Sequence, residues 1–125
     1  LGAPKLILEK EKVVGQKQRE NFKKAFQAGV KIAYGTDAGV YPHGLNGRQF
    51  AIMTQWGMTP MQAIQAATMS ASDLLGWKER LGSISVGKFA DIVAVTENPI
   101  EKISVLENVQ FVMKDGVVYK NLITK

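Results

Sequence analysis

The chain has 125 residues, of which 46% are hydrophobic and 22% charged, and it carries a formal net charge of +5. This composition is ordinary for a folded protein and excludes long disordered tracts. No apolar run approaches the roughly 20 residues that cross a bilayer, so we expect no membrane partner. The length suffices for a compact domain but not for a closed eight-stranded α/β barrel, which takes about 250 residues.

Two absences narrow the chemistry further. The chain has no cysteine, which excludes disulfides and thiol nucleophiles, and His43 is its only histidine. These counts leave it without the ligands of a closed zinc site. The N-terminus lacks a basic segment followed by an apolar core, so a cytoplasmic location is favoured, although a leader upstream of Leu1 lies outside the sequence.

The first predicted element is an amphipathic helix from about Glu9 to Ala28. Its many basic residues are interrupted by glutamates, as on a solvated helix face, while Val14, Phe22 and Phe26 recur at multiples of four on the opposite side. Gly29 supplies a left-handed stop. Because no aromatic residues are interleaved with the basic ones, we expect no nucleic-acid partner.

A short strand is predicted from Val30 to Thr36, and the carboxylate of Asp37 follows at its carboxyl end. A helix, a glycine and a near-continuous apolar strand match half of a βαβ unit, whose strands are parallel and covered on both faces. The next residues, 38–44, are rich in types that permit unusual backbone angles, so this loop can bring backbone close to a ligand.

Two helices are predicted next, the first from about Asn46 to Trp56. The second begins at Thr59, which can cap it, with Pro60 in the first turn and Gln62 completing a capping box, and it ends at Gly76. Its predicted buried stripe comprises Met61, Ile64, Thr68, Ala71 and Leu75.

The remainder, from Trp77 onward, is predicted to be all-β. Two short strand-like runs cover Gly82 to Lys88 and Ala90 to Val95. Two further strands, Val109 to Met113 and Val117 to Tyr119, flank an Asp-Gly pair that favours the tight turn of a hairpin.

Asp37 is the main candidate for chemistry. A carboxylate can take a proton from water only if that water is already acidified, and a bound zinc lowers the pKa of water from about 15.7 to about 7. Beside a metal, Asp37 could bind the ion through one oxygen, take the proton of the attacking water and pass it to the leaving amine. The alternative is an Asx-type turn in which Asp37 bonds its own backbone.

Four other residues are singled out. His43 could contact a substrate carboxylate or orient the proton shuttle, or it could simply bond to loop backbone. Tyr41 and Arg48 are weaker candidates for substrate binding: Arg48 could clamp a carboxylate in two places, yet an exposed helix arginine is the commoner case. Asp91, in the β-rich part, is predicted to satisfy backbone amides.

Several short motifs occur in an order and spacing that resemble the C-terminal end of metal-dependent amidohydrolases. The resemblance is narrower to the branch with imidazolonepropionase-like enzymes and Xaa-Pro dipeptidases or carboxypeptidases, and it runs from about residue 9 to 120. The motifs are Gly35-Thr36-Asp37-Ala38-Gly39, Pro42-His43-Gly44, Gly57-Met58-Thr59-Pro60-Met61-Gln62-Ala63, Ala66-Ala67-Thr68, Leu81-Gly82-Ser83-Ile84 and Gly87-Lys88-Phe89-Ala90-Asp91.

The resemblance implies an α/β fold: the C-terminal portion of a (β/α)8 TIM barrel in residues 1–76, followed by part of a flanking β-sandwich in residues 77–125. It also implies that Asp37 closes barrel strand eight as metal ligand and proton shuttle, with one or two zinc ions in the complete enzyme and none in the isolated chain. The substrate would be a small amide or dipeptide-like molecule.

The resemblance also indicates what is missing. The family takes its other ligands from a His-x-His pair on strand one, a lysine or glutamate on strand four, and histidines on strands five and six, so a missing N-terminal barrel segment is an expected partner. The rival hypothesis is a non-catalytic, self-associating structural or binding module, a homo-oligomer with no activity as an isolated chain.

Overall fold

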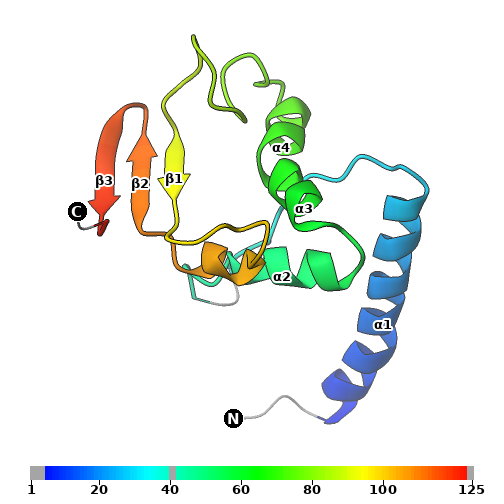
Figure 1. Cartoon of the computed structure of the whole chain (residues 1–125). Coiled ribbons are helices and arrows are strands. Elements are labelled where there is room, and N and C mark those ends of the chain that lie inside the picture. The colour runs from blue at the N-terminus through cyan, green and yellow to red at the C-terminus, as the bar shows by residue number, and fades with distance from the viewer. Residues whose placement is uncertain (1–4, 40–41, 124–125) are drawn as a thin grey trace. The chain divides into compact units, whose positions relative to one another are not determined.

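The computed structural model describes residues 5–39 and 42–123. The chain divides into two compact units, residues 1–31 and 32–125, and the division predicted between residues 76 and 77 stays a prediction. No helix in the described residues is both long and apolar enough to cross a membrane. The first unit holds helix α1 (Lys5–Gln27), and the second holds α2 (Arg48–Gln55), α3 (Pro60–Ala67), α4 (Met69–Leu74), β1 (Ile92–Ala94), the 3₁₀ helix η1 (Ile103–Glu107), β2 (Phe111–Lys114) and β3 (Val117–Asn121) (Figure 1).

Helix α1 confirms the predicted helix, although it begins earlier, at Lys5. It ends as predicted at Gly29: the N–H of Gly29 donates to the carbonyl of Phe26, and the N–H of Val30 donates to the carbonyl of Ala25, both at 3.0 Å. This pair of bonds satisfies carbonyls that a helix end otherwise leaves without a partner. The same closure ends α2 at Gly57 and α4 at Gly76.

The strand predicted from Val30 to Thr36 is wrong, because these residues belong to no β-ladder. A strand needs a neighbour to pair with, and in the described residues every other strand lies in the C-terminal sheet. Instead, the N–H of Tyr34 in this segment donates to the carbonyl of Ala66 on α3 at 2.9 Å.

The capping box at the start of α3 is confirmed. The N–H of Gln62 donates to Thr59 Oγ1 at 3.3 Å, and the N–H of Thr59 donates to Gln62 Oε1 at 2.8 Å. The single helix predicted to follow is broken in two at Thr68, where φ is −121° and ψ is −82°. The Thr68 hydroxyl donates to the carbonyl of Ile64 at 2.8 Å, a local bond that competes with regular helix geometry.

The buried stripe predicted for this helix pair is also wrong. Met61 and Leu75 are 48% and 68% exposed, whereas the buried positions of α3 and α4 are Ala63, Ala66 and Ser72. Small side chains let elements approach closely: Ala63 and Ala66 lie on α3, which packs against α2 and accepts the N–H of Tyr34, and Ser72 lies against Gly82. The positions that become buried on these helices are therefore those with small side chains, and not those with the most hydrophobic ones.

The run from Gly82 to Lys88, predicted as a strand, is a series of bends and turns. The ammonium group of Lys88 donates to the carbonyls of Lys78 and Leu81, and the N–H of Phe89 donates to the carbonyl of Arg80. The Arg80 guanidinium lies 4.8 Å from the Trp77 ring and 4.7 Å from the Phe89 ring, within cation–π range of both. These bonds fold the segment onto itself, so its backbone is not presented to a sheet.

The predicted hairpin is confirmed. Strands β2 and β3 pair antiparallel around Asp115 and Gly116, whose φ angles of 49° and 78° define the tight turn that Asp-Gly favours. Strand β1 pairs with the other edge of β2, which gives the order β1-β2-β3, and Figure 1 shows the three strands side by side.

Asp91 accepts a bond from a backbone amide, as predicted, and in doing so it links the turn of this hairpin to the residue before β1. Its Oδ1 accepts a hydrogen bond from the N–H of Asp115 at 2.7 Å, and its Oδ2 lies 2.6 Å from the ammonium of Lys114. The Lys114 ammonium and the Asp115 amide hold the pKa of Asp91 below its ordinary value of 3.8, and the Asp91 carboxylate raises the pKa of Lys114 above 10.5.

We expect Asp91→Asn to destabilise the protein at neutral pH, because the amide cannot pair with Lys114. A carboxyl whose folded-state pKa is depressed contributes stability above its unfolded pKa and loses it as the pH falls through the folded value. The difference in melting temperature from the wild type should therefore be largest between about pH 4 and 10, should shrink as the pH falls below the ordinary pKa of 3.8, and should vanish only below the depressed pKa of the folded state. A constant difference down to pH 2 would contradict this role.

Candidate functional site

Asp37 ends the extended segment that follows α1 and is exposed. Its φ is 47°, in the left-handed region that few residues other than glycine, asparagine and aspartate adopt. The backbone leading to it is fixed by the bond between Tyr34 and Ala66 on α3. The arrangement therefore presents an accessible carboxylate on a turn whose start is tied to the helical core.

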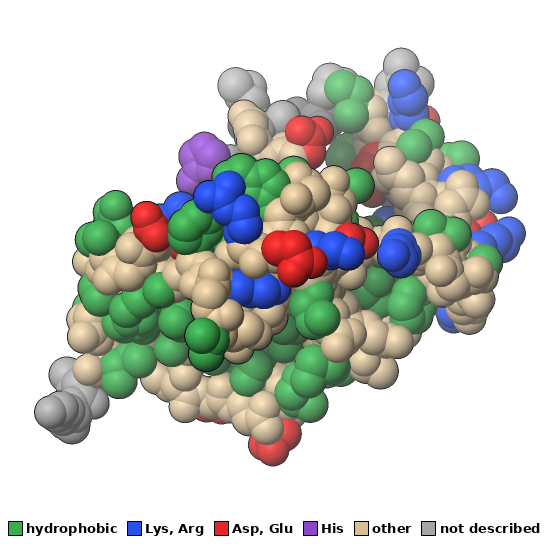
Figure 2. Space-filling view, turned by 90° about the horizontal axis from the view of Figure 1, so that it is seen from above, with side chains coloured by type: hydrophobic (Ala, Val, Ile, Leu, Met, Phe, Trp, Pro, Cys, Tyr) green, Lys and Arg blue, Asp and Glu red, His purple; other side chains and the backbone are tan. Residues whose placement is uncertain are grey.

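Of the other predicted site residues, His43 and Arg48 lie just before and at the start of α2. His43 is exposed, and Figure 2 shows the one histidine side chain at the surface. Tyr41 lies outside the described residues. Arg48, the first residue of α2, is exposed, and its Nε lies 3.7 Å from Oε2 of Glu107 on η1. Arg48 thus has a carboxylate partner within the chain, besides its predicted role in binding a substrate carboxylate.

The described residues do not themselves make a metal site. Within them, no group of three or more His, Cys, Asp or Glu side chains is close enough together to hold an ion. Asp37 can offer carboxylate oxygens, which suit zinc, but one side chain supplies only part of the four ligands that zinc takes. Any metal held by Asp37 needs further ligands from outside the described part of this chain.

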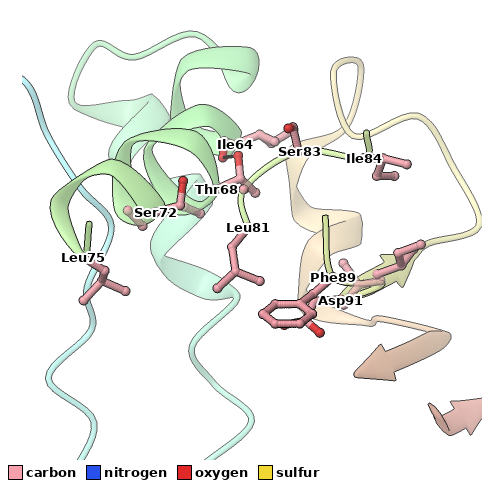
Figure 3. A pocket seen from close by; sticks show the side chains of 14 residues that line it. Ile64, Thr68, Ser72, Leu75, Leu81, Ser83, Ile84, Phe89 and Asp91 are labelled. Carbon is pink, nitrogen blue, oxygen red and sulfur yellow. Dashed lines mark hydrogen bonds between the residues drawn. The ribbon is translucent and has the colours of Figure 1, made fainter. Parts of the chain in front are cut away.

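An apolar pocket of about 460 Å³ lies elsewhere, between α3 and α4 on one side and residues 81–93 on the other. Figure 3 shows Ile64, Thr68 and Leu75 on the helical side and Phe89 and Asp91 opposite. Most of the predicted stripe lines this pocket, whereas Asp37 and His43 do not. Its one acidic group, Asp91, is engaged by Lys114 and Asp115, so the lining suits packing and not acid–base chemistry. The sequence did not lead us to predict this pocket. The feature that indicates it is the predicted stripe, most of whose side chains line the pocket and are not fully buried.

Comparison with known proteins assigns the chain to a class of hydrolases. Residues 5–119 match the Amidohydrolase family, and the chain belongs to this family. The resemblance inferred from the motif order is thereby confirmed.

Similar proteins include an Xaa-Pro dipeptidase, a prolidase and ochratoxinase. A crystal structure of an Xaa-Pro dipeptidase with methionine bound in its active site is 51% identical, with a TM-score of 0.87 over 94% of this chain and 29% of that chain. A putative prolidase from Bifidobacterium longum is 30% identical, with a TM-score of 0.88 over 94% of this chain and 30% of its own.

Ochratoxinase from Aspergillus niger is 40% identical over 100 residues, which cover 77% of this chain and 21% of that protein. Its crystal structure has a TM-score of 0.76 over 96% of this chain and 28% of that chain. The chain therefore spans less than a third of the length of these relatives.

Proposed function

We propose that this chain forms part of a metal-dependent hydrolase that cleaves amide or peptide C–N bonds in small, dipeptide-like substrates. The observation that carries the proposal is the family match over residues 5–119 together with 51% identity to an Xaa-Pro dipeptidase. An Xaa-Pro dipeptidase cleaves the peptide bond of a dipeptide that ends in proline, so an amide C–N bond of this kind is the proposed target.

Asp37 is the proposed catalytic residue. The complete enzyme would bind one or two zinc ions, and Asp37 would be a ligand of one of them. When bound, zinc would polarise the substrate carbonyl and acidify the attacking water. The carboxylate of Asp37 then accepts the proton of that water and delivers it to the nitrogen of the leaving amine. Its exposed position on a turn supports this role, because substrate and water can both reach it.

His43, Tyr41 and Arg48 are the proposed substrate-binding residues. A dipeptide carries a free carboxylate, and the Arg48 guanidinium can bind it through two parallel N–H donors. His43 can donate to the same group or orient Asp37. The sequence distance of six residues from Asp37 to His43, and the exposure of both His43 and Arg48, support their access to a substrate.

The same proposal implies where this chain would lie in the fold of the complete protein. In the complete protein, the missing N-terminal barrel segment would surround the segment that carries Asp37, and residues 77–125 would contribute to the β-sandwich. The exposure of Leu74, Leu75 and Ile84, at 76%, 68% and 83%, supports this completion, because such side chains are stabilised by burial against a partner. The apolar pocket beside them would be covered in the same way.

The proposal is tested on the natural polypeptide that contains this chain. We expect a mass corresponding to about three times this length, one or two zinc ions by elemental analysis, and hydrolysis of Xaa-Pro dipeptides. Chelation should abolish hydrolysis, and added zinc should restore it. A natural polypeptide of this length alone, without metal or amidase activity, would instead favour the self-associating module.

Self-association of the isolated chain is a separate expectation. The 125-residue chain alone should dimerise or aggregate, because both outer strands of its sheet have unpaired edges in the described residues and apolar side chains are exposed on α4. Multi-angle light scattering measures this directly, with the complete polypeptide as the control. A stable, monodisperse monomer of the isolated chain would count against the missing barrel segment.

A further inference from the structure

The described residues on either side of the candidate site are tied to each other. The hydroxyl of Tyr34, three residues before Asp37, donates to the backbone carbonyl of Asn46. The Tyr34 ring also lies 4.7 Å, between ring centroids, from Phe50 of α2. The position of the backbone that enters Asp37 therefore depends on where Asn46 and the start of α2 are held.

The start of α2 is held in turn by η1. A Cβ atom on Gly47 would lie 2.6 Å from the carbonyl oxygen of Leu106 and 2.9 Å from the Cα of Glu107. Backbone atoms cannot retract as the end of a flexible side chain does, so no residue larger than glycine fits here. The φ of Gly47 is −57°, which any residue adopts, so space alone requires this glycine.

Two further features join the same elements. Arg48 and Glu107 form an ion pair at the surface, with Nε and Oε2 3.7 Å apart. Behind it, α2 and η1 pack together, and each contributes a buried side chain, Met53 at 2% exposure and Val105 at 8%. The contact thus has a tight backbone approach, a buried apolar base and a charged rim.

We infer that η1 is a positioning element for the candidate active site: through Leu106 and Glu107 it fixes Gly47, and through Asn46 and Tyr34 that contact sets the backbone that carries Asp37. The inference rests on the proposed function of Asp37. Gly47 and Glu107 touch no reacting atom, so they are positioning residues. Since η1 lies among residues 77–125, the β-rich part of the chain takes part in the geometry of catalysis.

The test is Gly47→Ala in the natural polypeptide. We expect kcat for an Xaa-Pro dipeptide to fall on the order of ten- to a hundredfold, because a shift of about 1 Å in a catalytic group costs that much. KM and zinc content of the folded enzyme should change little, whereas its melting temperature should fall, because overpacking against backbone costs about 1–3 kcal/mol. Ser104→Ala, at an exposed position of the same η1, is the control and should leave kcat unchanged. A folded Gly47→Ala enzyme with wild-type kcat would overturn the inference.

Tyr34→Phe provides a second route if Gly47→Ala does not fold. It removes the hydroxyl that donates to Asn46 and retains the ring that contacts Phe50. A lower kcat at unchanged KM supports the inference, and an unchanged kcat overturns it.

Hydrogen exchange separates this inference from the proposed function, because it needs no hydrolysis. The N–H groups of Arg48 and Gln49 donate to the carbonyls of Leu45 and Asn46, each at 3.1 Å, and so report on the start of α2. If the natural polypeptide cleaves no amide, the proposed function fails on its own. Faster exchange at Arg48 and Gln49 in Gly47→Ala, and not in Ser104→Ala, still supports positioning by η1, whereas unchanged exchange overturns it.

Discussion

Replacing Asp37 by asparagine in the natural polypeptide should lower kcat for amide hydrolysis by about 10²- to 10⁴-fold, the usual contribution of a positioned general base. Asparagine has nearly the same shape and tolerates the left-handed backbone of this position, where φ is 47°, but its amide cannot accept the proton of the attacking water. The melting temperature should therefore stay close to that of the wild type. Steady-state kinetics and a thermal melt of the same preparation measure both quantities.

The chain offers a matched control for this substitution. Asp115 is also an aspartate with a positive φ, at 49°, and it lies in the β-hairpin turn. Asp115→Asn should leave kcat unchanged, since this turn is not part of the candidate site. Equal activity of Asp37→Asn and Asp115→Asn would contradict the proposed role of Asp37.

Zinc content of the Asp37→Asn polypeptide distinguishes the two parts of that role. Loss of about one zinc per polypeptide, relative to Asp115→Asn, would assign Asp37 as a ligand, because an amide binds zinc far less well than a carboxylate. Retained zinc with lost activity would assign it as the proton shuttle alone. The described residues contain no group of three or more His, Cys, Asp or Glu side chains that could hold a metal ion, so this measurement uses the natural polypeptide.

The features predicted correctly from the sequence are those that local chemistry determines. The Thr59–Gln62 capping box, the helix stop at Gly29 and the Asp115-Gly116 turn each involve residues within a few positions of one another. Asp91 is the exception: it is correctly predicted as a structural residue, but its partners Lys114 and Asp115 are distant in sequence and the prediction did not name them. Local bonds form whatever the rest of the chain does, so their signatures are readable in one sequence.

The features predicted wrongly depend on distant partners. Residues 30–36 have the composition of a parallel strand, but a strand forms only where another strand pairs with it. The run from Gly82 to Lys88 has alternating side chains, yet the Lys88 ammonium binds two carbonyls and folds the segment back. In both cases hydrophobic pattern favours a strand and tertiary contacts decide otherwise.

The candidate site likewise has features that the sequence predicts and features that it does not. The position of Asp37 after an apolar segment and before a glycine-rich loop was visible in the sequence, as was the family it belongs to. The support of that segment by η1 was not visible, because Gly47 and Leu106 are far apart in sequence and their contact is between backbones. A glycine required by space leaves no pattern that a single sequence reveals, which is why Gly82 also needs the structure to be understood.

Gly82→Ala should be the most destabilising small substitution in this chain, lowering the free energy of unfolding by about 2–5 kcal/mol. Its φ of 88° lies where an L side chain costs about 1–2 kcal/mol. In addition, the new Cβ would lie 2.3 Å from Ser72 Oγ and 2.9 Å from the carbonyl oxygen of Thr68, and overpacking of this kind costs about 1–3 kcal/mol. Ser72 is 5% exposed and its hydroxyl donates to the carbonyl of Met69, so it cannot move aside freely.

Gly87 is the matched control, because it has the same φ of 88° but no atom within 4 Å of an added Cβ. Gly87→Ala therefore carries the backbone cost alone, about 1–2 kcal/mol, and the difference between the two variants isolates the contact with α4. Thermal and urea unfolding of both variants in the natural polypeptide measure that difference. Equal losses would mean that α4 yields to the added methyl group.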